Sequence, residues 1–148
     1  MSRSIHPLHV DVMRVRHILD RAIDTHEQVH ERFFLARLLG LEFSYPDETC
    51  EVRFEVEEFL LNPKGHLHGG IVCVVLDACM GHLMHHVGQP SVTLEMKTQF
   101  LDSVAGGSLR ARASILKRGR SVSFLQCELQ DALCRSIAHA TATWKAVR

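Results

Sequence analysis

The stretch NPKGHLHGGIVCVVLDACMGHLMHH, residues 62–86, decides how this chain folds. Its first part, residues 62–70, is rich in Pro and Gly, which predicts a loop. The part that follows is apolar on every side for about four turns and stops at a Gly-Gln-Pro break. Its valines would also suit a strand, but the length of the run favours a helix. We therefore expect a buried helix over residues 70–86.

The segments around this helix show two different spacings of their apolar residues. Residues 8–40 read as helical, with apolar positions three and four apart, whereas residues 50–56 alternate as in a half-buried strand. Four further strand-like segments come after the helix, at residues 93–100, 109–115, 121–129 and 134–147. This order is typical of an α+β protein with an antiparallel sheet. The dry face of such a sheet must be covered, and the 70–86 helix is the segment apolar enough to cover it.

Composition and charge exclude several classes of protein. The chain has 148 residues, the length of one domain, and its 17 basic and 17 acidic residues give no net field that would attract nucleic acid or a membrane. The apolar run is shorter than the about 20 residues that span a bilayer. The amino-terminal residues contain no apolar signal segment. Five cysteines without a CxxC motif predict reduced thiols and a cytoplasmic location.

Asp77 is the residue that most suggests chemistry. It lies in the middle of the expected helix, where it cannot cap, and its neighbours in the sequence are apolar. A buried carboxylate is costly unless it is paired. Asp77 is therefore a paired structural residue, a residue on the helix edge that reaches water, or a general base or nucleophile in a dry cleft.

The turn His68-Gly69-Gly70 begins the same helix. A helix N-terminus offers unpaired backbone N–H groups and the positive end of the dipole. Glycines there let a substrate oxygen approach, as in an oxyanion hole. Alternatively, the glycines serve an entry turn that needs positive φ. The position of Asp77, seven residues after Gly70, favours the functional interpretation.

The motif NPKGHLHGGIVCVVLDACMG resembles the signature of the hotdog-fold acyl-CoA thioesterases of the phenylacetate-degradation group, which is close to N-P-x-G-x-x-H-G-G-x-x-x-x-L-x-D. The resemblance extends from about Phe33 to Trp144. It implies a hotdog fold, an α+β structure in which an antiparallel sheet of five to six strands wraps around a long central helix, with N-terminal helices. It divides the chain into an N-terminal helical extension, residues 1–30, and a hotdog thioesterase domain, residues 31–148.

The resemblance also implies roles for single residues. Asp77 is the catalytic carboxylate, which activates water or attacks the thioester, and the Gly69 N–H polarises the thioester carbonyl. Asn62 helps to hold that carbonyl or the water, His68 supports the site, and Thr93 assists the water. The implied assembly is a homodimer or a dimer of dimers that shares each active site between subunits. No cofactor is implied, because coenzyme A is part of the substrate.

Five basic residues fall within 11 positions, Arg110, Arg112, Lys117, Arg118 and Arg120. They could form the solvated face of a hairpin. They could also hold the phosphates of coenzyme A. The resemblance favours phosphate binding for Lys117, Arg118, Gly119, Arg120 and Ser121. Because no aromatic residues interleave with the charges, single-stranded nucleic acid is not an expected ligand.

Other functions remain open at this stage. His82 and His86 have a spacing that can chelate a metal, but no HExxH motif or acidic ligand set accompanies them, so we expect no metal site. A hotdog enoyl-CoA hydratase or dehydratase would usually show a different arrangement of His and Asp or Glu. A non-catalytic acyl-CoA-binding protein is the other alternative, and the intact motif favours an enzyme over it.

Overall fold

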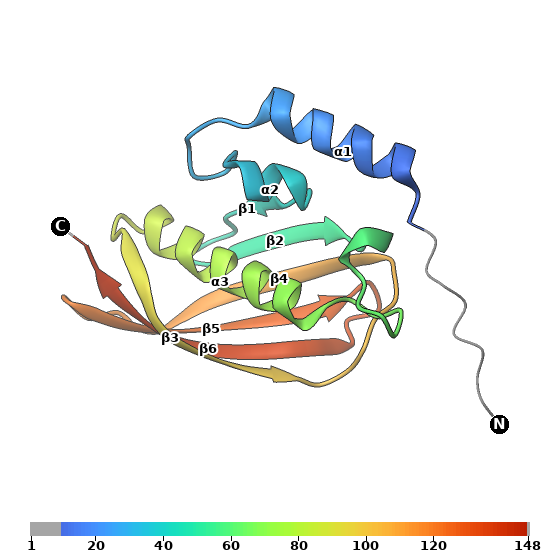
Figure 1. Ribbon diagram of the computed structural model, residues 1–148. Coiled ribbons are helices and arrows are strands. Elements are labelled where there is room, and N and C mark those ends of the chain that lie inside the picture. The colour runs from blue at the N-terminus through green and yellow to red at the C-terminus, as the bar shows by residue number, and fades with distance from the viewer. Residues whose placement is uncertain (1–9, 148) are drawn as a thin grey trace.

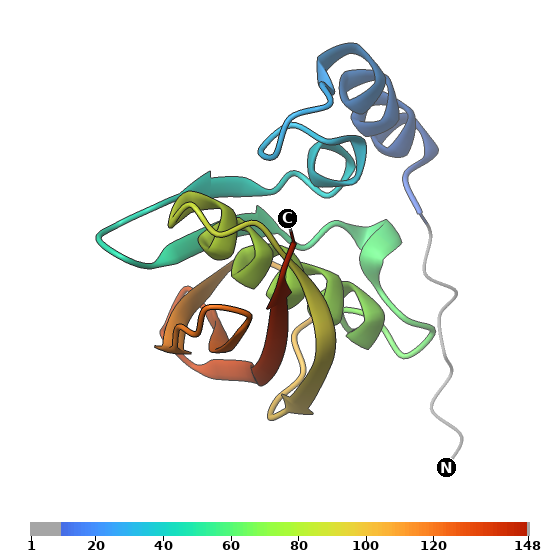
Figure 2. The same cartoon turned by 90° about the vertical axis from the view of Figure 1, so that its left-hand side faces the viewer.

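One curved sheet holds a single long helix in its concave face (Figures 1 and 2). The computed structural model describes residues 10–147. The chain forms, in order, α1 (Val12–Thr25), α2 (Phe34–Leu38), β1 (Glu42–Ser44), β2 (Cys50–Glu55), the 3-10 turn η1 (Glu58–Leu60), α3 (Gly69–His86), β3 (Ser91–Phe100), β4 (Ser108–Lys117), β5 (Val122–Asp131) and β6 (Ser136–Ala146). All pairings are antiparallel, and the six strands lie in the order β1-β2-β4-β5-β6-β3. The α+β sheet around a central helix is therefore confirmed.

Helix α3 is the centre of the core. Its Val75, Leu76, Cys79, Met80 and Leu83 side chains are fully buried. The strands beneath it carry small buried residues, namely Ala111, Ala113, Ala138, Ala140 and Ala142. Small side chains on the sheet let the helix backbone come close, so that large side chains of the helix fill the space between the two layers.

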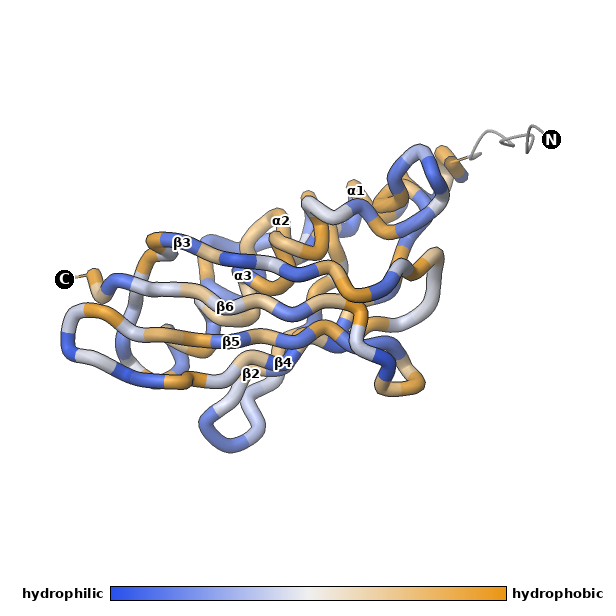
Figure 3. Tube along the Cα trace, turned by 90° about the horizontal axis from the view of Figure 1, so that it is seen from below, coloured by the Kyte–Doolittle hydropathy of each residue, from blue (hydrophilic) through white to orange (hydrophobic). Residues whose placement is uncertain are grey.

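Inward and outward residues alternate along the strands, and Figure 3 shows the alternation as changes of hydropathy along the chain. Strand β3 differs from its neighbours because it lies at the edge of the sheet and most of its residues are exposed. A register shift between Thr93 and Glu95 interrupts its pairing with β6. Beside α3, the sheet is consequently open along β3.

The amino-terminal part is less regular than the sequence predicted. Helix α1 begins at Asp11, whose carboxylate accepts hydrogen bonds from two backbone N–H groups of the first turn. The second predicted helix is reduced to the five residues of α2, and Gly40 ends this segment with φ of 65°. Residues 26–33 form a loop instead. Within residues 10–147, no helix combines the length and the apolarity needed to cross a bilayer.

The small residues beneath α3 can be tested by substitution. Ala140→Leu places a larger side chain at a fully buried position, and we expect it to lower the free energy of unfolding by about 1–3 kcal/mol. The neighbouring Thr141 faces outward and is exposed, so Thr141→Leu should change it by less than about 0.5 kcal/mol. Urea unfolding of both variants measures the difference. Equal effects would mean that close approach of α3 does not depend on the alanines.

Candidate functional site

Asp77 lies on the side of α3 that faces the open edge of the sheet. The Thr93 hydroxyl of β3 donates a hydrogen bond of 2.7 Å to Asp77 Oδ1. Asp77 is half-buried, so the sequence interpretation of a carboxylate on the helix edge describes its position better than a deeply buried one. Its apolar sequence neighbours point to other faces of the helix, which is why they did not predict its exposure. One carboxylate oxygen is thus fixed by Thr93, and Oδ2 has no hydrogen-bond partner among the described residues.

Two more contacts hold β3 alongside α3. The Cys73 thiol lies 3.7 Å from the Thr98 hydroxyl, and the Phe100 ring packs over Gly69. Together with the Asp77–Thr93 pair, these contacts join β3 to α3 along the first half of the helix. The site residues on this side of α3 are therefore positioned by the edge strand.

The glycine turn at the start of α3 leaves one backbone donor available. His68 is the N-cap residue, and its Nδ1 accepts a hydrogen bond of 2.9 Å from the Gly70 N–H. The Gly69 N–H makes no hydrogen bond within the described residues. Neither glycine has positive φ. A Cβ at Gly69 would lie 3.2 Å from the Phe100 ring, so close packing explains this glycine and an entry turn with positive φ does not.

Asn62 lies beside this turn. Its Oδ1 accepts hydrogen bonds from the Lys64 N–H at 2.8 Å and the His66 N–H at 3.4 Å, which fixes the loop before α3. Its amide Nδ2 remains available as a donor. Asn62, Gly69 and Phe100 share the lining of a small cavity of about 260 Å³.

The predicted catalytic residues form two groups within one chain. Asp77 and Thr93 are in contact, and Asn62, His68 and Gly69 gather at the start of α3. Asp77 follows Gly69 by eight residues, which corresponds to about 12 Å along a helix. One chain therefore does not bring its own Asp77 and Gly69 to the same atom.

A larger cavity of about 710 Å³ lies next to Asp77. It extends along the second half of α3 beneath the loop before α2, and its lining includes His30, Phe33, Asp77, His82 and Trp144. Sequence reasoning missed the loop residues, because nothing in a single sequence links residues 28–33 to α3. His82 carried a signal, since a histidine in an apolar helix needs a polar partner.

The basic turn between β4 and β5 lies near the far end of α3 from Gly69. Arg118 donates hydrogen bonds to the Gln89 side chain at 2.7 Å and to the Val87 carbonyl at 2.8 Å, which fastens the turn to the helix end. A Cβ at Gly119 would lie 2.1 Å from the Val122 carbonyl, so the turn needs this glycine for its shape. The side chains of Lys117 and Arg120 are exposed and make no hydrogen bond or ion pair within the described residues. These two side chains are the ones available to a ligand.

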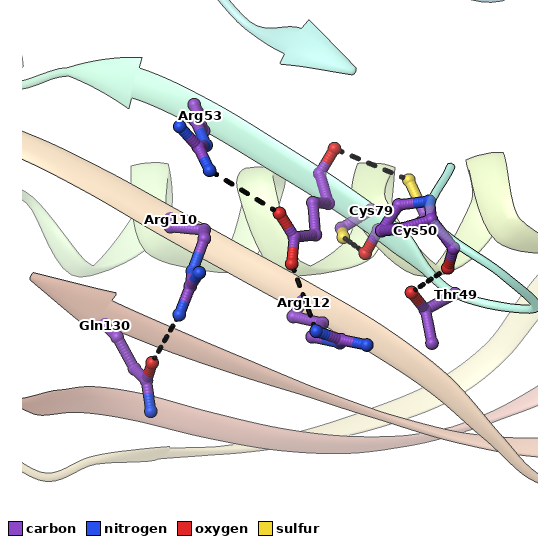
Figure 4. A network of polar contacts seen from close by, with 9 residues as sticks. Thr49, Cys50, Arg53, Cys79, Arg110, Arg112 and Gln130 are labelled. Atoms are coloured by element: carbon purple, nitrogen blue, oxygen red, sulfur yellow. Dashed lines mark hydrogen bonds and ion pairs between the residues drawn. The ribbon is translucent and has the colours of Figure 1, made fainter. Parts of the chain in front are cut away.

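The other two arginines of the basic run lie on the outer face of the sheet and contact residues of the neighbouring strands. Arg112 forms an ion pair with Glu51 at 3.2 Å, and Arg110 donates to the Gln130 side chain at 3.2 Å. Figure 4 shows Arg53, Arg110 and Arg112 on the neighbouring strands β2 and β4. Glu51 also lies 3.9 Å from Arg53. For Arg110 and Arg112 the geometry fits the solvated-face interpretation.

The histidines of α3 point to separate aromatic partners. His82 stacks on Phe43, His85 stacks on His30, and His86 stacks on Tyr45. Within residues 10–147, no three His, Cys, Asp or Glu side chains are arranged to hold a metal ion. Cys79 is buried in the core, and burial raises the pKa of its thiol. That thiol is therefore poorly suited to nucleophilic attack.

Comparison with known proteins adds to this geometry. Residues 64–137 match the thioesterase superfamily. A Haemophilus influenzae protein with the name "Putative esterase" is 27% identical over 103 residues, which cover 65% of this chain and 75% of that protein. A Streptococcus mutans protein solved with acetyl-CoA bound has 25% identity and a TM-score of 0.69, over 72% of this chain and 88% of the other.

A further solved structure is the PaaI protein of E. coli, from the phenylacetic acid degradation operon. It has a TM-score of 0.77 at 19% identity, over 88% of this chain and 96% of the other. These matches confirm the hotdog fold. The stretch matched by the superfamily includes Gly69, Asp77, Thr93 and the basic turn, whereas Asn62 lies just before it.

Proposed function

Because this chain belongs to the thioesterase superfamily, we propose that it hydrolyses the thioester of an acyl-CoA to a free acid and coenzyme A. The observation that carries the proposal is the Asp77 carboxylate, held by Thr93 at the border of a large cavity. A carboxylate oriented through one oxygen keeps the other free to act. Membership of the phenylacetate-degradation group and a cytoplasmic location belong to the same proposal, the latter resting on the five cysteines, which are all free thiols.

Asp77 has two possible actions. As a general base, its Oδ2 takes a proton from water while the water oxygen bonds to the thioester carbon. The resulting tetrahedral oxyanion then collapses, the C–S bond breaks, and the coenzyme A sulfur leaves as a thiolate that is protonated. As a nucleophile, Oδ2 itself bonds to that carbon and expels the thiolate, and water then hydrolyses the mixed anhydride. Both routes need stabilisation of the same oxyanion.

The start of α3 provides donors for that oxyanion. The Gly69 N–H points from a helix N-terminus and has no partner in the described chain. Asn62, whose Nδ2 makes no hydrogen bond within the described residues, lines the same small cavity as Gly69. Because His68 accepts at Nδ1, its Nε2 carries the proton and is a further donor.

We propose a homodimer, or a dimer of dimers, in which each site combines Asp77 with Gly69 of the partner subunit. The separation of about 12 Å between these residues along one helix supports such an arrangement, because both are proposed to act on the same thioester. The edge strand β3 supports it, because Val92, Leu94 and Phe100 are exposed there. An unpaired strand edge with apolar side chains is a surface that another chain can cover.

Asp77→Asn tests the catalytic carboxylate. The amide is nearly isosteric and can still pair with Thr93, so the fold should be kept while kcat falls by about 10²–10⁴-fold. Hydrolysis of an acyl-CoA, followed by release of free thiol, gives the rate. The matched control is Asp24→Asn on the exposed face of α1, which should leave kcat unchanged. Turnover near that of the unmodified protein in Asp77→Asn would contradict the assignment.

Gly69→Pro removes the backbone donor without removing the helix. Gly69 is the first residue of α3, where proline is well tolerated, and His68 has the extended conformation that precedes proline. We expect kcat to fall by about 10²–10³-fold. Gly69→Ala keeps the N–H and introduces a similar Cβ contact with Phe100, so it separates loss of the donor from crowding. Comparable losses in both variants would show that packing alone matters.

The same variant tests the shared site. Co-expression of Gly69→Pro with Asp77→Asn gives mixed dimers in which one of the two sites has both intact groups. Random pairing should therefore restore about a quarter of the unmodified activity. Each variant alone should remain inactive. If the mixture is as inactive as its components, each site lies within one subunit.

Neutralising the free charges of the basic turn tests coenzyme A binding. We expect Lys117→Gln with Arg120→Gln to raise KM for an acyl-CoA about tenfold, because two exposed charge contacts are lost, with little change in kcat. The effect should shrink at high salt and be absent with an acyl-pantetheine, which lacks the nucleotide. Arg16→Gln with Arg21→Gln, on exposed positions of α1, is the control. Equal losses on both substrates would assign the turn a structural role.

A further inference from the structure

The large cavity has a polar end, where His82 lies beside His30 and His85. His82 follows Asp77 by five positions on α3, which is about 7.5 Å along the helix, and both residues border the cavity. Much of the remaining lining is apolar, including Phe33, Val74 and Trp144. An acyl group whose thioester meets Asp77 would therefore extend past apolar walls toward His82.

Hydrogen bonds fix the proton of the His82 ring. The Tyr45 hydroxyl donates to Glu31 Oε1 at 3.1 Å, since a carboxylate can only accept. Tyr45 has no second proton, yet its oxygen lies 3.1 Å from His82 Nδ1. His82 Nδ1 must then be the donor, and in the neutral ring Nε2 carries a lone pair.

The charges around the ring agree with this assignment. Burial lowers the pKa of His82 to about 4, so the ring is neutral near pH 7. Burial by itself would raise the pKa of Glu31. Its hydrogen bonds, including the one from Tyr45, and the nearby histidines outweigh burial and lower that pKa. Glu31 is therefore an ionised acceptor, and burial raises the pKa of Tyr45 so that the phenol keeps its proton.

Packing fixes the orientation of the ring as well. Phe43 stacks on His82 with ring centroids 3.7 Å apart and an angle of 9°, and the His30 ring lies 4.8 Å away. The side chain is only 3% exposed. Nε2 makes no hydrogen bond within the described residues, and it is not one of their fully buried unpaired atoms, so it keeps some exposed surface. The cavity that His82 borders is where a hydrogen-bond donor can reach this nitrogen.

We propose that His82 determines acyl specificity by accepting, at Nε2, a hydrogen bond from a hydroxyl at the far end of the acyl group. The inference rests on the proposed thioester hydrolysis and adds the class of acyl group. Tyr45 and Glu31 act as positioning residues, since they hold His82 as an acceptor. A substrate hydroxyl that reaches the His82 ring satisfies the acceptor, whereas a methyl group of similar size leaves it unpaired.

Hexanoyl-CoA and its ω-hydroxy derivative are the matched substrates for the test. We expect kcat/KM of the unmodified protein to favour the hydroxylated substrate about tenfold, the effect of one net hydrogen bond. His82→Phe keeps the ring stack and removes the acceptor. It should reverse the preference, because the hydroxyl would then be buried without a partner. His17→Phe, at an exposed position of α1 outside the cavity lining, should leave the preference unchanged.

Tyr45→Phe gives a second test that keeps the imidazole. Without the phenol oxygen, the His82 proton can move to Nε2, which then donates instead of accepting. Because a hydroxyl can also accept, this variant is compared on ω-methoxyhexanoyl-CoA, whose ether oxygen only accepts. The unmodified protein should disfavour the methoxy substrate relative to the hydroxy substrate, and Tyr45→Phe should reduce that discrimination while hexanoyl-CoA is hydrolysed at the original rate. This variant decides the matter if His82→Phe does not fold. The inference is overturned if the unmodified protein hydrolyses both substrates equally, or if His82→Phe retains the preference. If neither substrate is hydrolysed, and butanoyl-CoA and octanoyl-CoA also remain intact, the proposed function itself fails.

Discussion

The burial of α3 is the constraint on which the rest of the structure depends. The helix is apolar almost all round, so it is stable only when surrounded. The sheet surrounds most of it and brings small alanines to its inner face, which lets the helix lie close. Six strands curve around one helix but leave one side open along β3. The polar side chain of Asp77 lies on that side, where its ionised form is not forced out of water.

The same constraint separates the groups proposed to be catalytic. A helix fixes the distance between its residues, so a donor at its first turn and a carboxylate two turns later cannot converge on one atom. The open edge resolves this conflict if a second chain covers it. In one chain the sheet leaves α3 uncovered along β3, and Asp77 lies too far from Gly69 to act on the same atom. Both features favour the proposed association of subunits.

Much of the fold could be predicted from the sequence because its periods are clear. The apolar run predicted the helix, and the alternation of apolar and polar residues predicted five of the strands, with bounds within about two residues. Strand β1 has only three residues, too few to show a period. The sequence predicted a helix across the loop at residues 26–33 because Phe34 and Leu38, four positions apart, continue the helical spacing of α1. The sequence left the exposure of Asp77 open between a helix edge and a dry cleft, since adjacent residues on a helix point in different directions.

The candidate site combines residues from the stretch matched by the superfamily with residues from outside it, which a single motif could not reveal. Gly69, Asp77, Thr93 and His82 all lie in the stretch matched by the superfamily. The groups that fix the proton of His82, Glu31 and Tyr45, lie before that stretch and come from a loop and a turn. Reaction chemistry needs a fixed geometry, which α3 and β3 provide, whereas the choice of acyl group can be altered in segments that do not hold the core together. In the proposed specificity site, the histidine therefore belongs to the rigid helix, but residues packed on it from outside decide whether it accepts or donates a hydrogen bond.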